Sequence, residues 1–279
     1  MKDNVMQVSE IDIPSKESNQ IYICPKQSAN VLFKFMKELK YLKDIIKNKA
    51  IIPRYCQEDI EYLNVEGLEK IAFPMSCFCD IQLNKLEYHM EKYGMCGIGM
   101  NKEWGIREGL QPINYINSQS NLKKDFTHVF LKAMKLEYEG DLENTIDEYN
   151  NNLLTSLCYM KPICGKMIIQ GRDEQRNFHD EREWRYIPDV NNVNTGLPQL
   201  IPAEQLTEVA YDSYSKGIVQ CEKLWLKFEY DNIKHIIVEG VKDREELISF
   251  IINDINAAYD EKMILISKIL VFKELKEDW

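Results

Sequence analysis

The chain has 279 residues, 44% of them hydrophobic and 29% charged, with a formal net charge of −10. This composition is typical of a soluble globular protein with a sizeable core, and the acidity argues against a surface that binds nucleic acid mainly by counterion release. The sequence shows no signal-peptide pattern and no apolar run of membrane-spanning length, so we expect a cytoplasmic protein without a membrane partner.

The eight cysteines lie mostly inside apolar runs. This placement predicts free thiols in a reducing compartment rather than a disulfide framework. Cys77 and Cys79 are separated by one residue, not by the two to four that are typical of zinc sites, and the four histidines are scattered along the chain. We therefore expect no metal.

The N-terminal part predicts an arm, then a strand and a helix. Residues 1–28 are polar and weakly periodic and form the expected arm. Val31 to Phe35 alternates as a strand does, and the apolar residues that follow have the spacing of an amphipathic helix: Leu39, Leu42, Ile45 and Ile46. Pro53 cannot continue that helix.

Two apolar stretches predict buried strands. Ile71 to Asp80 is a continuous run of small and apolar residues, as in a strand covered on both faces. Gly94 to Met100 alternates glycine with apolar residues but lacks the Lys-Ser/Thr of a phosphate-binding loop. We interpret it as a strand that a ligand or another backbone approaches closely. Between the two, Leu83 to Tyr93 has helical spacing.

The rest of the chain completes one α+β domain over residues 29–279, because no repeat or low-complexity linker divides it. Residues 118–160 predict a helical insertion between two parts of one sheet. We expect a strand at Cys164–Gln170 that forms a hairpin with the stretch 177–188. Further strands are expected at Trp225–Phe228, His235–Val238 and Ile264–Leu270, with a helix over Glu245–Ile255.

The stretch from Asn177 to Pro188 carries the densest set of chemically capable side chains. Its aromatic and β-branched end and its proline favour an extended segment. On a strand, one face would present Glu181, Glu183 and Arg185, and the other Arg182, Trp184 and Tyr186. The two carboxylates would lie about 7 Å apart. This pattern predicts a catalytic pair, with a charged sheet edge or a surface helical pair as the alternatives.

Four blocks of the sequence resemble the AbiGi family of bacterial abortive-infection, phage-resistance proteins. They are Pro74–Ile81, the helix end at His89–Gly94, Gly97–Gly105 and Asp180–Tyr186. The likeness extends from about residue 30 to the C terminus. Members are usually described as the antitoxin of a two-gene phage-exclusion system, so the resemblance implies a partner toxin or antitoxin from a neighbouring gene.

A second resemblance suggests a mechanism. A first strand that runs into a helix with Leu-x-x-Ile-Ile spacing, then Pro53-Arg54-Tyr55, is similar to the opening of DarT-like and RNA phosphotransferase-like members of the ADP-ribosyltransferase superfamily. Their late strand carries a glutamate, often two positions after another acid, which matches Glu181-x-Glu183. The resemblance implies a mixed, mostly antiparallel sheet like an ADP-ribosyltransferase core. It also implies NAD as the substrate.

The resemblance also implies roles for individual residues. Glu183 would be the catalytic acid, stabilising an oxocarbenium-like transition state by pre-placed negative charge, and Glu181 would hold the acceptor or act as base. The residues expected to bind NAD are Lys34, Phe35, Phe73, Phe78 and Tyr93. Lys34 and Phe35 depart from the family, which places a His or Arg with Thr or Gly there.

Three hypotheses follow. The main one is an enzyme that transfers ADP-ribose from NAD to a nucleic acid or protein during phage infection. The alternative is a non-catalytic antitoxin that neutralises a partner toxin by direct binding, with the residues from Glu181 to Arg185 merely structural. A metal-dependent nuclease using Asp80, Glu181 and Glu183 as oxygen ligands ranks behind both, because the sequence offers no ordered ligand spacing for it.

Overall fold

The computed structural model describes residues 22–65, 68–139, 145–169, 172–202 and 207–278. Its strands are β1 (Val31–Met36), β2 (Ala50–Ile51), β3 (Arg54–Asp59), β4 (Lys70–Cys79), β5 (Cys96–Asn101), β6 (Gln111–Pro112), β7 (Asn114–Ile116), β8 (Met160–Pro162), β9 (Cys164–Ile169), β10 (Arg172–Asn177), β11 (Glu183–Tyr186), β12 (Ile201–Pro202), β13 (Leu226–Lys227), β14 (Ile233–Val238) and β15 (Ile269–Val271). The helices are α1 (Leu39–Asn48), α2 (Glu87–Tyr93), α3 (Lys102–Arg107), α4 (Asn121–Glu139), α5 (Thr145–Cys158), α6 (Glu208–Val219), α7 (Val241–Asp254), α8 (Tyr259–Ser267) and α9 (Phe272–Lys276).

The main sheet has the order β15-β14-β5-β1-β4-β11-β6, and β3 and β12 also pair with β4. All its pairings are antiparallel except that of β14 with β15. The expected α+β class with a mixed, mostly antiparallel sheet is therefore confirmed. Most of the expected N-terminal arm, residues 1–28, lies outside the described residues.

Strand β4 holds the two halves of this sheet together. Near its end, Cys79 pairs with Phe33 of β1, and Ser76 to Cys79 pair with β11. Its first half, Lys70 to Met75, pairs with β3. All of its residues except Lys70 and Cys77 are buried. This confirms the buried strand predicted from the apolar run, and β4 supports the strands β3 and β11, which carry Glu58, Glu183 and Arg185 of the candidate site.

The glycines of β5 make room for aromatic side chains. A Cβ atom on Gly97 would lie 2.5 Å from the ring of Phe35, and one on Gly99 would lie 2.8 Å from the ring of Phe33. The two rings stack at 6.0 Å, and their row continues through His89 to Tyr93. The strand prediction is confirmed; the close approach comes from side chains of β1 at Gly97 and Gly99, and from the backbone of Met36 at Gly94, as expected for that end of the stretch.

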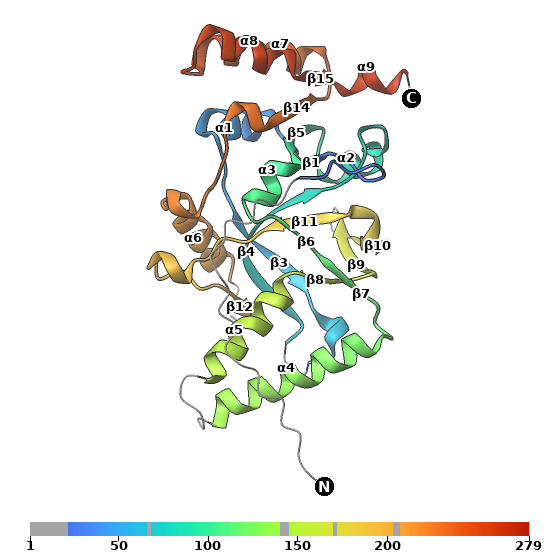
Figure 1. Cartoon of the computed structure of the whole chain (residues 1–279), viewed down its shortest axis with the longest axis vertical. Helices are drawn as coiled ribbons and strands as arrows, with labels where there is room; N and C mark the ends of the chain where they lie inside the picture. The colour runs from blue at the N-terminus through green and yellow to red at the C-terminus, as the bar shows by residue number, and fades with distance from the viewer. Residues whose placement is uncertain (1–21, 66–67, 140–144, 170–171, 203–206, 279) are drawn as a thin grey trace.

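Helices cover the sheet on both faces (Figure 1). One core contains Leu42 of α1, Trp104 of α3 and Leu247 of α7. A second core, of Leu86, Met90 and Phe272, brings α2 and α9 to the opposite face. The helices α4 and α5, which occupy the stretch expected to be a helical insertion, pack over β3 and the first half of β4 through a third core that includes Phe130 and Leu157.

Three local predictions are wrong. The hairpin partner of β9 is β10, because β11 pairs instead with β4 and β6. The stretch Ile264–Leu270 is mainly the end of α8, and only β15 after it is extended. Glu181 lies in a 3-10 turn, Phe178–Glu181, and not on a strand. The apolar stretch Ile264–Leu270 fits a helix or a strand equally well, so tertiary contacts decide its conformation. Strand partners are likewise decided by tertiary pairing.

All eight cysteines are free thiols, as the sequence predicts. Among the described helices, none has both the length and the apolar character needed to cross a bilayer.

We predict that Gly97→Ala lowers the free energy of unfolding by about 1–3 kcal/mol, because the new methyl group overlaps the Phe35 ring in a packed core. Urea denaturation measures the effect. In the double variant Gly97→Ala/Phe35→Leu the overlap is relieved, so the two costs should not add. Strict additivity would contradict the assigned contact.

Candidate functional site

Glu183, at the start of β11, lies at the centre of a buried group of charges. Its Oε2 accepts a hydrogen bond from Lys161 Nζ at 3.0 Å, and its Oε1 accepts one from Arg185 Nε at 2.7 Å. The residue is only 6% exposed. Burial alone raises the pKa of the Glu183 carboxyl, but Arg185 and Lys161 outweigh burial and hold this pKa well below its usual value. Glu183 is therefore a buried carboxylate with both oxygens engaged.

Arg185 connects this carboxylate to two other elements. Its side chain is fully buried, and its Nη1 donates to the Cys158 carbonyl at the end of α5 at 2.6 Å. Its Nη2 lies 3.0 Å from Oε2 of Glu58 on β3, an ion pair without hydrogen-bond geometry. The guanidinium also lies over the Phe73 ring. As predicted, Glu183 and Arg185 share one face of a strand.

Glu181 reaches the same lysine from a different element. Its Oε2 accepts from Lys161 Nζ at 3.2 Å, and its Oε1 accepts from the Tyr93 hydroxyl at 2.7 Å. Arg176 Nη1 lies 3.3 Å from that Oε1. Burial first, and then the Glu181 charge, raise the pKa of Tyr93 above its usual value, so this hydroxyl remains a donor at neutral pH.

We call Glu58, Lys161, Arg176, Glu181, Glu183 and Arg185 the ion network. The predicted pair of acids is thus brought together, but through a shared lysine rather than along one strand. The cause is local: Arg182 has a left-handed backbone, with φ 44°, between the 3-10 turn and β11. Across this kink, both glutamates reach the same Lys161 Nζ, at 3.2 and 3.0 Å.

The sequence analysis missed Lys161 and Arg176. Lys161 is the single charge in the run Leu157–Ile163 and is 9% exposed. Burial lowers its pKa, but Glu183 and its acidic neighbours outweigh burial and raise it well above the usual value. A lone lysine in an apolar run is the feature that marks it, because a buried charge requires a partner. Arg176, on β10, carries no comparable mark.

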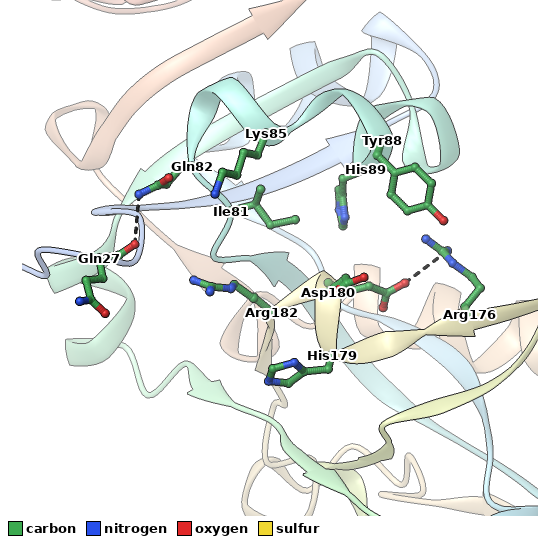
Figure 2. Close-up of a pocket in the computed structure, with 11 residues that line it drawn as sticks. Gln27, Ile81, Gln82, Lys85, Tyr88, His89, Arg176, His179, Asp180 and Arg182 are labelled. Atoms are coloured by element: carbon green, nitrogen blue, oxygen red, sulfur yellow. Dashed lines mark hydrogen bonds and ion pairs between the residues drawn. The ribbon is translucent and has the colours of Figure 1, made fainter.

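A cavity of about 360 Å³ lies beside the ion network. It opens between the α2 region and the turn before β11, with Ile81, Tyr88 and His89 on one wall and Arg176 and Asp180 on the other (Figure 2). Glu181 lines it, whereas Glu183 is not among its lining residues. Of the two expected catalytic acids, only Glu181 therefore borders the cavity, although it is 5% exposed and as buried as Glu183.

The five residues expected to bind NAD do not gather at this cavity. Phe35 packs on one face of the sheet with Phe33 and Leu86, Phe78 belongs to the opposite core, and Phe73 to the core under α4 and α5. The half-buried Lys34 directs Nζ to the Cys77 carbonyl at 3.5 Å and over the Phe78 ring. Tyr93 comes closest, through its bond to Glu181.

Asp80, the third acid of the nuclease hypothesis, forms a separate ion pair with Lys102. Lys102 Nζ lies 2.6 Å from Asp80 Oδ2 and also donates to the Ser28 hydroxyl and the Ala29 carbonyl, each at 3.1 Å. Over the ranges that the structure describes, no group of three or more His, Cys, Asp or Glu side chains is placed to hold a metal ion. The acids here are partnered by lysine and arginine.

These contacts determine what the site can do chemically. Both oxygens of Glu183 accept hydrogen bonds inside the core, so this carboxylate acts on the fold by linking β11, β8 and α5. Glu181 also accepts a hydrogen bond from Lys161, and it lines the cavity together with His89. Burial, and then the nearby Arg176 charge, lower the pKa of His89 to about 4. At neutral pH this imidazole is uncharged.

We predict that Glu183→Gln destabilises the protein by about 3–5 kcal/mol, because it leaves Lys161 and Arg185 buried without their main counter-charge. Chemical denaturation at neutral pH measures the change. The matched control is Glu222→Gln, which breaks an exposed ion pair with Lys227 and should cost less than about 1 kcal/mol. Equal effects in the two variants would show that the ion network does not stabilise the fold.

We predict that His89 adds a pH dependence to stability. Its folded-state pKa of about 4 lies below the ordinary value of 6.5, so the unfolded chain binds the extra proton first. The stability from neutral His89 is complete above pH 6.5 and is lost as the pH falls towards 4, up to about 3 kcal/mol. Unfolding free energies of wild type and His89→Gln should therefore converge on acidification. Parallel curves would refute this assignment.

Comparison with known proteins identifies the family. The sequence profile described as "Putative abortive phage resistance protein AbiGi, antitoxin" matches residues 49–239. A relative named "Abortive phage resistance protein AbiGi", from Lactococcus lactis subsp. cremoris, is 35% identical over 252 residues, which cover 82% of this chain and 100% of that protein. No solved structure matches. The matched profile includes β3, β4, β11 and the whole ion network, and the chain belongs to the AbiGi family of abortive phage resistance proteins.

Proposed function

We propose that this protein is the antitoxin of a phage-defence pair and that it neutralises a toxin by direct binding. One observation carries the proposal: Glu183, the acid that the enzymatic hypothesis needs most, is 6% exposed and has both oxygens bonded to Lys161 and Arg185. A buried carboxylate so engaged stabilises a fold. The description of the matched family as an antitoxin points the same way.

The charge of the chain agrees with binding to a basic protein. The formal net charge is −10, and a surface of one sign attracts a partner of the opposite sign and accelerates their encounter. Such a complex needs no bond cleavage, so its formation depends on surface charge and shape. The acids of the ion network lie inside the protein and serve to keep that surface in place.

Co-expression with a candidate toxin encoded by a neighbouring gene tests the proposal. We expect growth to be rescued and the two proteins to co-purify as a complex that weakens at high salt. Glu181→Gln should retain rescue, because the proposed role needs no carboxylate at the cavity. Rescue without any complex, or loss of rescue in a folded Glu181→Gln variant that still binds the toxin, would refute binding as the mechanism.

A second candidate is ADP-ribose transfer from NAD. It is favoured by one observation, that Glu181 lines the cavity beside His89 and Arg176. In this candidate Glu181 stabilises the cationic sugar in the transition state, and Glu183 supports the fold. Incubation with labelled NAD and host extract should then label an acceptor, and a Glu181→Gln variant that thermal unfolding shows to be folded should not label it. Equal labelling by the two proteins would exclude Glu181 as the catalytic acid.

A further inference from the structure

Two cations at the cavity have no partner within the described residues. Lys85 and Arg182 both line the cavity, and neither side chain makes an ion pair, a hydrogen bond or a ring contact with another described residue. They come from opposite walls, Lys85 from the segment before α2 and Arg182 from the turn before β11 (Figure 2). Among the other charges of the wall, Arg176 and Glu181 neutralise each other. Together with Asp180, the other charged wall residue without a described ionic partner, the unpaired charges are two positive and one negative.

The backbone holds Arg182 firmly in place. Its N–H donates to the His179 carbonyl at 3.3 Å, and its carbonyl accepts from the Asp80 N–H at 3.0 Å. The Asn177 side chain accepts from the His179 N–H at 3.1 Å and so caps the turn. Arg182 has φ 44°, a left-handed conformation that costs free energy in any residue but glycine. The backbone of Arg182 is thus fixed at the edge of the cavity, while its exposed side chain is free of ion pairs, hydrogen bonds and ring contacts with other described residues.

Further polar groups complete the wall. Gln82 and His179 line it, and so does Asp180, whose carboxylate has no described partner. Ile81 adds an apolar surface. Free cations suit a phosphate, because charge-assisted bonds from Arg and Lys are the strong ones. A carboxylate in the same cavity suits a sugar hydroxyl, which donates a hydrogen bond to it as in nucleotide sites.

The size of the cavity limits the size of the ligand that it can bind. Its volume of about 360 Å³ lies at the lower end of the usual range for small-molecule sites, which favours a mononucleotide over a dinucleotide. We propose that this cavity binds a nucleoside mono- or diphosphate, with the phosphate between Lys85 and Arg182 and a sugar hydroxyl at Asp180. This inference goes beyond the antitoxin proposal and does not depend on it, since no toxin enters the argument.

Isothermal titration calorimetry of the full chain tests the site, with AMP, ADP, adenosine and inorganic phosphate as the probes. We expect AMP and ADP to bind more tightly than adenosine or phosphate alone, and binding to weaken as salt rises. Arg182→Gln and Lys85→Gln should each reduce the affinity for AMP by roughly tenfold or more, the loss expected for one charge-assisted bond. Asp180→Asn should reduce the preference for AMP over inorganic phosphate.

The matched control is Lys124→Gln, an exposed lysine of α4 outside the cavity, which should bind AMP as the wild type does. Thermal unfolding of each variant verifies that it is folded. We expect little change in Tm, since the side chains of Lys85 and Arg182 make no ion pair, hydrogen bond or ring contact with any other residue that the structure describes. The proposal is overturned if neither AMP nor ADP binds, or if the Lys85 and Arg182 variants bind as the control does. Neither result would affect the co-purification experiment with the toxin.

Discussion

The structure depends on the pairing of a buried carboxylate with two buried cations. Glu183 accepts from Lys161 at 3.0 Å and from Arg185 at 2.7 Å, and these two residues belong to β8 and β11. A charge without a partner in a core costs several kcal/mol, so each member of the ion network requires the others. The network therefore fixes the helical pair α4 and α5 against the sheet, through the Arg185 bond to the Cys158 carbonyl.

The same network separates the two acids by function. A left-handed residue, Arg182, lies between the glutamates; both acids are buried, but only Glu181 also lines the cavity. A pair of acids two residues apart is thus not one catalytic unit here. Glu183 links strands inside the fold, whereas Glu181 also lines the cavity. The two acids are therefore tested by separate substitutions.

Membership of the AbiGi family gives this arrangement a biological setting, abortive phage resistance. An antitoxin that works by contact needs a rigid scaffold and a defined surface, and the buried charges supply rigidity. A cavity with two unpartnered cations adds a second property. If a nucleoside phosphate occupies it, the protein would carry both a partner surface and a small-molecule site, with Arg182 contributing to the geometry of both the turn and the cavity.

Much of the fold was predictable from local pattern. The alternation of Val31–Phe35, the apolar run at 71–80 and the spacing of Leu39 to Ile46 identified β1, β4 and α1, because side-chain periodicity reports which face is buried. The family resemblance was also present in the sequence alone. The helix α8 was not predicted: its apolar residues suit a strand, but a bond from the Ala258 N–H to Glu261 caps the helix and Leu265 packs in the core.

The sequence by itself determined the α+β class, the acidic charge, the free thiols and the pair of glutamates around residue 182. Only the tertiary structure decided what those glutamates do. Their roles depend on Lys161 of β8 and Arg176 of β10, which the fold brings to the same carboxylate of Glu181, and on a single left-handed residue. Electrostatic pairing acts through space, and the distance between charges is fixed only when strands separated in the chain come together.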